Sequence, residues 1–142
     1  MLQMRQDFSL PRYKGDLMKK EQMDKLLGDA VVRFYKLKGL EPTKAAMKRL
    51  PTETAYKEVQ AKESDAFLNA RNALMESGLV TEENRDAGIV EGIVYAGVAN
   101  MNPAVVVICV EDSTIRICAY AKEGLIKQHT AEKAIEKYIR VL

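Results

Sequence analysis

Apolar residues recur at intervals of three and four between residues 16 and 38, which is the spacing of one face of an α-helix. The sequence therefore predicts an amphipathic helix over 16–38, with Asp16 as its N-cap and Gly39 just beyond its end. The apolar positions are Met23, Leu26, Leu27, Ala30, Val31, Phe34 and Leu37.

Two further helices are predicted in the first half of the chain. Residues 43–50 lie between Pro42 and Pro51, and the rings of these prolines limit a short helix to that stretch. Thr52 is a suitable cap for a third helix over 53–77, which ends before a glycine.

Residues 81–100 are compatible with two structures. Thr81 and the two glutamates after it have the composition of a helix start, and the apolar segment over 87–100 is long for a strand. The same segment alternates from Ile89 to Tyr95, as a strand does. We favour the helix and keep the strand as the alternative.

Residues 104–110 and 115–121 predict a β-hairpin, with residues 111–114 as its turn. If Val110 lies opposite Ile115, one face of the hairpin is apolar throughout, because Ile108 then meets Ile117 and Val106 meets Ala119. The opposite face carries Val105, Val107, Cys109, Arg116, Cys118 and Tyr120.

A last amphipathic helix is predicted over 131–141, capped by Thr130, and its apolar face would cover the sheet. The expected fold is a single α+β domain, with a flexible arm at 1–14, a helical part at 16–80 and an α/β hairpin part at 81–142. A lone hairpin with an apolar edge is marginal, so the sheet needs a third strand or a second subunit. We therefore expect a homo-oligomer, in the simplest case a homodimer. The apolar face of the last helix consists of Ala134, Ile135, Tyr138 and Ile139.

The composition is that of an ordinary globular protein, with 47% hydrophobic and 30% charged residues. Residues 1–14 lack the apolar segment of a secretory signal, and the longest apolar run, 104–110, is far shorter than the roughly 20 residues that span a bilayer. The two cysteines form no CxxC pair, which suits a reducing compartment. We expect a cytoplasmic protein with no membrane partner.

The sequence lacks the motifs of the common enzyme classes. It contains no GxxxxGK[S/T] loop and no GxGxxG, HExxH, CxxC or GxSxG motif. The one histidine, His129, is expected to be an exposed residue ahead of the last helix. Cys109 and Cys118 are either a redox pair activated by Arg116 or small core residues, and the pattern favours the core. We therefore expect no enzymatic activity, no cofactor and no metal site.

Positive charge is concentrated in the first half of the chain, where residues 1–63 carry a net charge of +5 and residues 64–142 carry −3. Residues 41–60 also have the outline of a helix-turn-helix. A DNA-binding regulator is thus one alternative function. Its nucleic-acid contacts would be Lys44, Lys48, Arg49, Lys57 and Lys62.

The leading hypothesis is a non-enzymatic, cytoplasmic regulatory or binding protein that acts as a homo-oligomer, with its sheet at or near the subunit interface. A second alternative is a module that binds or sequesters a small anionic ligand. Arginine and tyrosine suit such a ligand through bidentate hydrogen bonds and stacking. The residues expected to bind it are Arg116, Tyr120 and Tyr95.

Overall fold

The computed structural model describes residues 20–37, 52–123 and 127–142. Their helices and strands are, in chain order, α2 (Lys20–Leu37), β1 (Thr52–Gln60), α4 (Ala66–Ser77), β2 (Leu79–Asn84), β3 (Ile89–Ala96), the 3₁₀ turn η1 (Val98–Asn100), β4 (Asn102–Glu111), β5 (Thr114–Lys122) and α5 (Thr130–Arg140). The α+β class predicted from the sequence is confirmed. Among the described residues, no helix is both long and apolar enough to cross a membrane.

The five strands form one antiparallel sheet in the order β1-β5-β4-β3-β2. Strands β2 to β5 follow one another as a meander. Strand β1 comes before α4 in the chain and pairs with β5, from Thr52 opposite Lys122 to Gln60 opposite Thr114. The apolar β4 therefore lies at the centre of the sheet, with a neighbour on each side.

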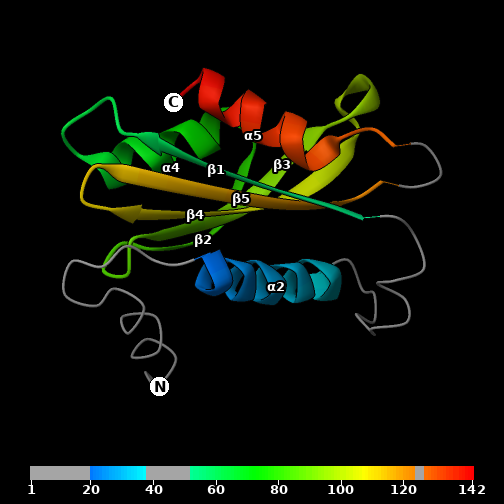
Figure 1. Ribbon diagram of the computed structural model, residues 1–142, viewed down its shortest axis with the longest axis horizontal. Helices are drawn as coiled ribbons and strands as arrows, with labels where there is room; N and C mark the ends of the chain where they lie inside the picture. The colour runs from blue at the N-terminus through cyan, green and yellow to red at the C-terminus, as the bar shows by residue number, and fades with distance from the viewer. Residues whose placement is uncertain (1–19, 38–51, 124–126) are drawn as a thin grey trace.

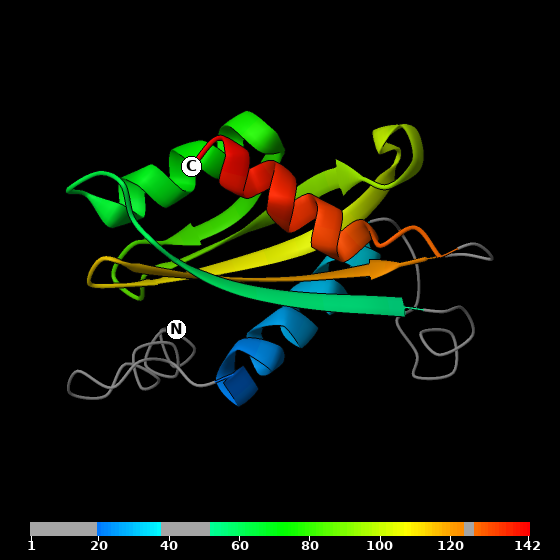
Figure 2. The same cartoon turned by 45° about the horizontal axis from the view of Figure 1, so that its top comes forward.

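Helices cover both faces of the sheet (Figure 1). Helix α2 lies against one face, and α4 and α5 lie against the other, an arrangement that is also visible in the rotated view of Figure 2. Each face has its own apolar cluster. On the α2 side the cluster joins Met23, Leu27, Ala30, Val31 and Tyr35 to Ile89, Ile93, Val105, Val107, Cys109 and Cys118.

The hairpin and its predicted register are confirmed, but the turn is shorter than the predicted 111–114. Glu111 pairs with Thr114, which leaves Asp112 and Ser113 as the turn. Val110 pairs with Ile115, Ile108 with Ile117 and Val106 with Ala119. The predicted first helix is confirmed over Lys20–Leu37. Several predicted structural features lie outside the described residues: the arm at 1–14, the cap Asp16, the stop Gly39 and the helix at 43–50.

The predicted helix over 53–77 is wrong in its first half. Residues Thr52–Gln60 form β1, and the helix α4 begins only at Ala66. The N-cap is Asp65, whose carboxylate accepts the amide of Leu68 at 3.1 Å. Pairing with β5 along the whole strand outweighs the helical spacing of a few apolar residues, because local propensity is weaker than sheet pairing.

The helix favoured for 87–100 is also wrong, and the strand alternative is correct. Thr81 lies inside β2 and Ile89–Ala96 form β3. Gly92 fits this strand assignment. A Cβ at this position would lie 2.1 Å from the carbonyl oxygen of Leu79, so only glycine lets β2 approach β3 this closely. The third strand comes from the same chain, and the sheet needs no second subunit to protect β4. The homo-oligomer itself stays a prediction.

The last helix is confirmed, but its cap differs from the prediction. Helix α5 begins at Thr130, and the preceding His129 has a left-handed backbone with φ of 56°. The side chain of Thr130 accepts a hydrogen bond from Asn102 Nδ2 at 2.8 Å. The free amides of the first turn bond instead to carboxylates of Glu53 and Glu123, which lie far apart in the sequence.

Candidate ligand-binding site

A cavity of about 280 Å³ lies between α2 and strands β2, β3 and β4. Its inner wall is apolar, since Ala30, Ile93 and Val105 are buried. Its outer wall carries exposed polar side chains. The lining residues are Ala30, Arg33, Phe34 and Lys36 of α2, Thr81 and Glu82 of β2, Glu91 and Ile93 of β3, and Val105 of β4.

The main polar feature of the cavity is a two-point ion pair between Arg33 and Glu91. Arg33 Nε lies 3.1 Å from Glu91 Oε2, and Arg33 Nη2 contacts Glu91 Oε1. The Glu91 side chain is only 9% exposed and that of Arg33 is 35% exposed. Glu82 adds a second carboxylate, 3.6 Å from Arg33 Nε. The hydrogen bonds that Arg33 donates to Glu91 raise the pKa of Arg33 although burial opposes this, so the guanidinium stays charged.

Secondary structure explains how this pair is held. Arg33 follows Ala30 by one helical turn, which places it beside the buried stripe of α2. Ile89, Glu91 and Ile93 occupy every second position of β3, so strand geometry directs the Glu91 side chain to the same α2 face as the two isoleucines. The backbone oxygen of Glu91 accepts the hydroxyl of Thr81 at 3.2 Å, which ties β3 to β2 at the cavity.

Arg33 and Glu91 were not among the residues expected from the sequence. If one face of a strand is assumed to face solvent, a glutamate on that face needs no partner. Once helices cover both faces, the same pattern demands a buried cation partner for Glu91. The sequence signal for this partner was Arg33, a cationic residue on the apolar side of α2.

The three residues predicted to bind an anionic ligand share the α2 face of the sheet but are spread along it. Arg116 pairs with Cys109, and its Nη2 lies 3.7 Å from Glu58 Oε2. Tyr95 lies opposite Pro103, six residues along β4 from Cys109, or about 20 Å at the usual strand rise.

Tyr120 interacts with Tyr35 of α2, and burial together with this contact raises the pKa of Tyr35. The phenol of Tyr120 is thus engaged in packing α2 against the sheet, where it borders the apolar cluster of that face. None of Arg116, Tyr120 and Tyr95 lines the cavity.

Both cysteines are free and buried, as the core interpretation predicts. Burial raises the pKa of the Cys109 thiol, with a smaller contribution in the same direction from Cys118. Arg116 acts in the opposite direction and is outweighed. The thiol is therefore protonated at neutral pH, which is the opposite of an activated cysteine.

The predicted nucleic-acid contacts are divided by the structure. Lys57 is exposed on β1 and Lys62 is exposed in the following loop. Lys44, Lys48 and Arg49 lie outside the described residues. The second helix of the predicted helix-turn-helix is the strand β1, so this motif is absent from the described residues and no longer supports DNA binding.

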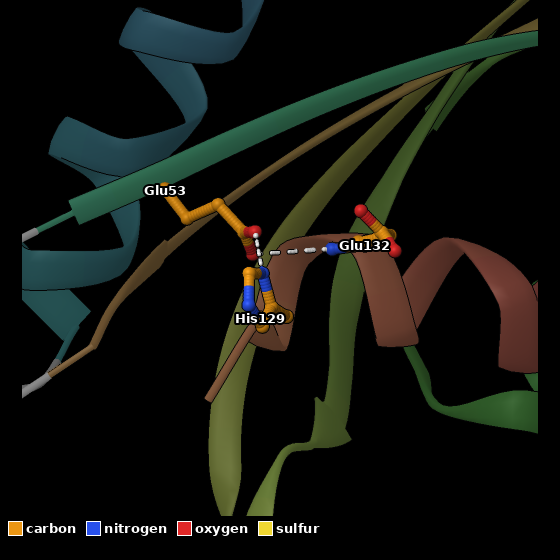
Figure 3. A group of neighbouring side chains, drawn as sticks. All are labelled: Glu53, His129 and Glu132. Atoms are coloured by element: carbon orange, nitrogen blue, oxygen red, sulfur yellow. Dashed lines mark hydrogen bonds and ion pairs between the residues drawn. The ribbon is translucent and has the colours of Figure 1, made fainter. Parts of the chain in front are cut away.

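A second group of chemically capable side chains lies at the start of α5, at the β1 edge of the sheet (Figure 3). Glu53 Oε2 lies 3.1 Å from His129 Nδ1, and Glu53 Oε1 accepts the amides of Ala131 at 2.8 Å and Glu132 at 3.3 Å. The carboxylate of Glu123, a residue only 2% exposed, accepts the amides of Gln128, His129 and Thr130. Two carboxylates from outside the helix therefore cap its first turn.

Burial opposes ionisation of Glu123, but hydrogen bonds from the Thr130 hydroxyl and from the amides of Thr130, His129 and Gln128 outweigh it and lower the pKa. Glu123 is thus a buried anion at neutral pH. Its role is structural, because all of these partners belong to the first turn of α5 or precede it directly.

No protein-family model and no curated protein matches the sequence, and no solved structure matches the fold. Function is therefore inferred from the cavity and its residues.

Proposed function

We propose that the protein is a non-enzymatic binding protein that holds a small, uncharged, mainly apolar molecule in the cavity between α2 and the sheet. The observation that carries this proposal is the cavity itself, with an apolar inner wall and the partly buried Arg33–Glu91 pair in its lining. Ligand sites commonly combine an apolar lining with a few fixed polar groups, in volumes of about 300–1,000 Å³. The 280 Å³ here suits a small molecule.

The charges around the cavity favour a neutral ligand. Arg33 and Lys36 contribute two positive charges to the lining, and Glu82 and Glu91 contribute two negative ones. Because Glu91 already binds the guanidinium at two points, an anion would have to compete with a buried carboxylate. A ligand with an apolar body and one hydrogen-bonding group fits without breaking the pair.

Binding rather than catalysis is proposed because the lining pairs its acids with an arginine. A general base needs a carboxylate or imidazole whose proton affinity is poised for transfer. The guanidinium holds the Glu91 carboxylate in place through two hydrogen bonds, which suits recognition and orientation of a ligand.

The test is titration with two naphthalene dyes, the uncharged Prodan and the anionic anilinonaphthalene sulfonate, followed by fluorescence. We expect saturable binding of one Prodan molecule per chain and at least about tenfold weaker binding of the sulfonate. Ala30→Leu adds bulk to the inner wall and should weaken Prodan binding by at least about tenfold. Thr81→Phe, at an exposed strand position on the rim, should have the same effect; it removes the hydroxyl bond to the Glu91 backbone oxygen but adds no bulk to the buried inner wall.

The matched control is Gly28→Leu on the exposed side of the same helix, where an added Cβ meets nothing within 4 Å. This variant should bind Prodan as the wild type does. Equal Prodan affinity in the wild type and in both cavity variants, with folding verified by circular dichroism, would refute the proposal.

We also propose that this binding protein is cytoplasmic and acts as a homo-oligomer. Its two free, buried thiols support a reducing compartment. Light scattering coupled to size exclusion tests the oligomer: a mass of at least twice 15.9 kDa is expected, and a monomer at micromolar concentration would exclude it.

A further inference from the structure

Glu53, His129 and Glu132 bring three metal-ligating side chains together from two segments that are 76 residues or more apart. Each offers one ligand atom, and the three atoms lie within 4.8 Å of one another. Glu53 comes from β1 and the other two from the start of α5, so the group bridges the edge strand and the helix (Figure 3). An imidazole with two carboxylates is a ligand set that zinc and similar divalent ions accept.

The backbone fixes two of the three ligands. Glu53 Oε1 accepts hydrogen bonds from two helix amides, which orients Oε2 towards His129 Nδ1 at 3.1 Å. The left-handed backbone of His129, with φ of 56°, turns its ring towards β1. Non-glycine residues rarely adopt this conformation, and such strain is found preferentially at functional positions.

The third ligand, Glu132, is not needed to cap the helix, because another carboxylate already does so. Glu132 is the third helical residue, where a glutamate ordinarily reaches back to the amide of the N-cap residue. Here that amide, on His129, already bonds to Glu123. With Glu53, Glu123 and Glu132 present, the helix start carries more negative charge than the half positive charge of a helix N-terminus balances. A cation would neutralise the excess.

The distances suit a tetrahedral ion with small adjustments. Two ligands at about 2.1 Å from one ion lie about 3.4 Å apart at the tetrahedral angle, so the Glu53–His129 pair needs to open by about 0.3 Å. Glu132 is exposed, and rotation of its side chain brings the carboxylate within the same range. Water would complete the coordination.

We propose that Glu53, His129 and Glu132 bind a divalent transition-metal ion of the zinc type, which links β1 to α5. The ion binds Nδ1 of the ring in place of the contact between Nδ1 and Glu53, and a proton carried by Nδ1 is released to solvent. This site lies at the β1 edge of the sheet and the cavity lies beside β2 at the other edge, so the two proposals stand independently.

The decisive experiment uses the tag-free full chain and zinc chloride, with binding measured by calorimetry. His129 is the one histidine of the chain, so its two ring nitrogens can be followed in ¹H–¹⁵N spectra without any assignment ambiguity. We expect one zinc ion per chain and a large shift of the Nδ1 resonance on binding. Zinc should also raise the melting temperature, since it binds the folded state.

The variants separate ligand loss from misfolding. His129→Asn keeps a residue type that tolerates the left-handed backbone and should weaken zinc binding at least about a hundredfold. Glu132→Gln leaves both caps intact and should weaken it at least about tenfold. Glu76→Gln, an exposed carboxylate on α4, is the control for the loss of one negative charge and should bind as the wild type does.

Zinc binding that is equally strong in the wild type and His129→Asn, or an Nδ1 resonance that does not move at saturation, would overturn the proposal. Unchanged affinity in Glu132→Gln would overturn the three-ligand site.

Discussion

Removal of Arg33 tests whether the ion pair at the cavity holds the α2 side of the fold together. Arg33→Met keeps the aliphatic part of the side chain and leaves the Glu91 carboxylate, 9% exposed, without its two-point partner. Loss of one partner from a fully buried pair costs about 3–5 kcal/mol. Because the Arg33 side chain is 35% exposed and borders the cavity, water can reach the pair, and we expect about 2 kcal/mol.

The reverse substitution should cost less. In Glu91→Met the guanidinium keeps Glu82, 3.6 Å from its Nε, and remains partly solvated, so a loss of about 1 kcal/mol is expected. The double variant removes both charges from the interface between α2 and the sheet, and it should lie within about 1 kcal/mol of the wild type. The cycle then gives a coupling energy of about 2–4 kcal/mol.

The assay is urea unfolding followed by far-ultraviolet circular dichroism, which suits a chain without tryptophan. The slope of the unfolding free energy against urea should be the same in all four proteins, which shows that the denatured state has not changed. If the two single losses simply add in the double variant, the pair is screened by solvent and does not anchor the site.

Three further predictions concern the frame around the site. Gly28→Ala, exposed in mid-helix, should stabilise the protein by about 0.5–1 kcal/mol, whereas Gly92→Ala should destabilise it by about 2–3 kcal/mol because β2 must move away; melting curves that shift in the same direction for both would contradict this. Cys109 and Cys118 should react with a disulfide reagent only at the rate of unfolding, and fast labelling of the native protein would show that the thiols are accessible. Asp65→Asn should lower the melting temperature at pH 7 and have less effect at pH 3. The hydrogen bond that Arg85 donates to Asp65 lowers the pKa of Asp65. The stabilisation of the fold by this carboxylate is therefore present above the ordinary carboxyl pKa and is lost as the pH falls. An equal effect of the substitution at both pH values would refute this.

The sequence was sufficient to predict elements whose pattern and packing agree. In α2 and α5 the apolar stripe is also the buried stripe, and in the hairpin the pairing of Val110 with Ile115 follows from the turn and the alternation. These elements needed no knowledge of distant segments. The predicted face of Arg116 and the two cysteines was correct for the same reason.

The errors arose where a distant partner decides the structure. Strand β1 is a strand because β5 pairs with it, and Gly92 serves in a strand because Leu79 lies against it. Neither contact is visible in local spacing. The candidate site was missed on the same grounds, because Glu91 becomes a buried charge only when α2 covers its face of the sheet, and Arg33 lies 58 residues away.

The pairing of β1 with β5 also sets an order of events during synthesis. Residues Thr52–Gln60 leave the ribosome early, but their partner, Thr114–Lys122, is made more than fifty residues later. Strands β2 to β5 are consecutive hairpin neighbours and can assemble as each is completed, whereas β1 must wait unpaired for the last strand. The β1–β5 contacts should therefore be among the last to form, and newly made chains should be most vulnerable to aggregation and to chaperone capture before residue 122 emerges.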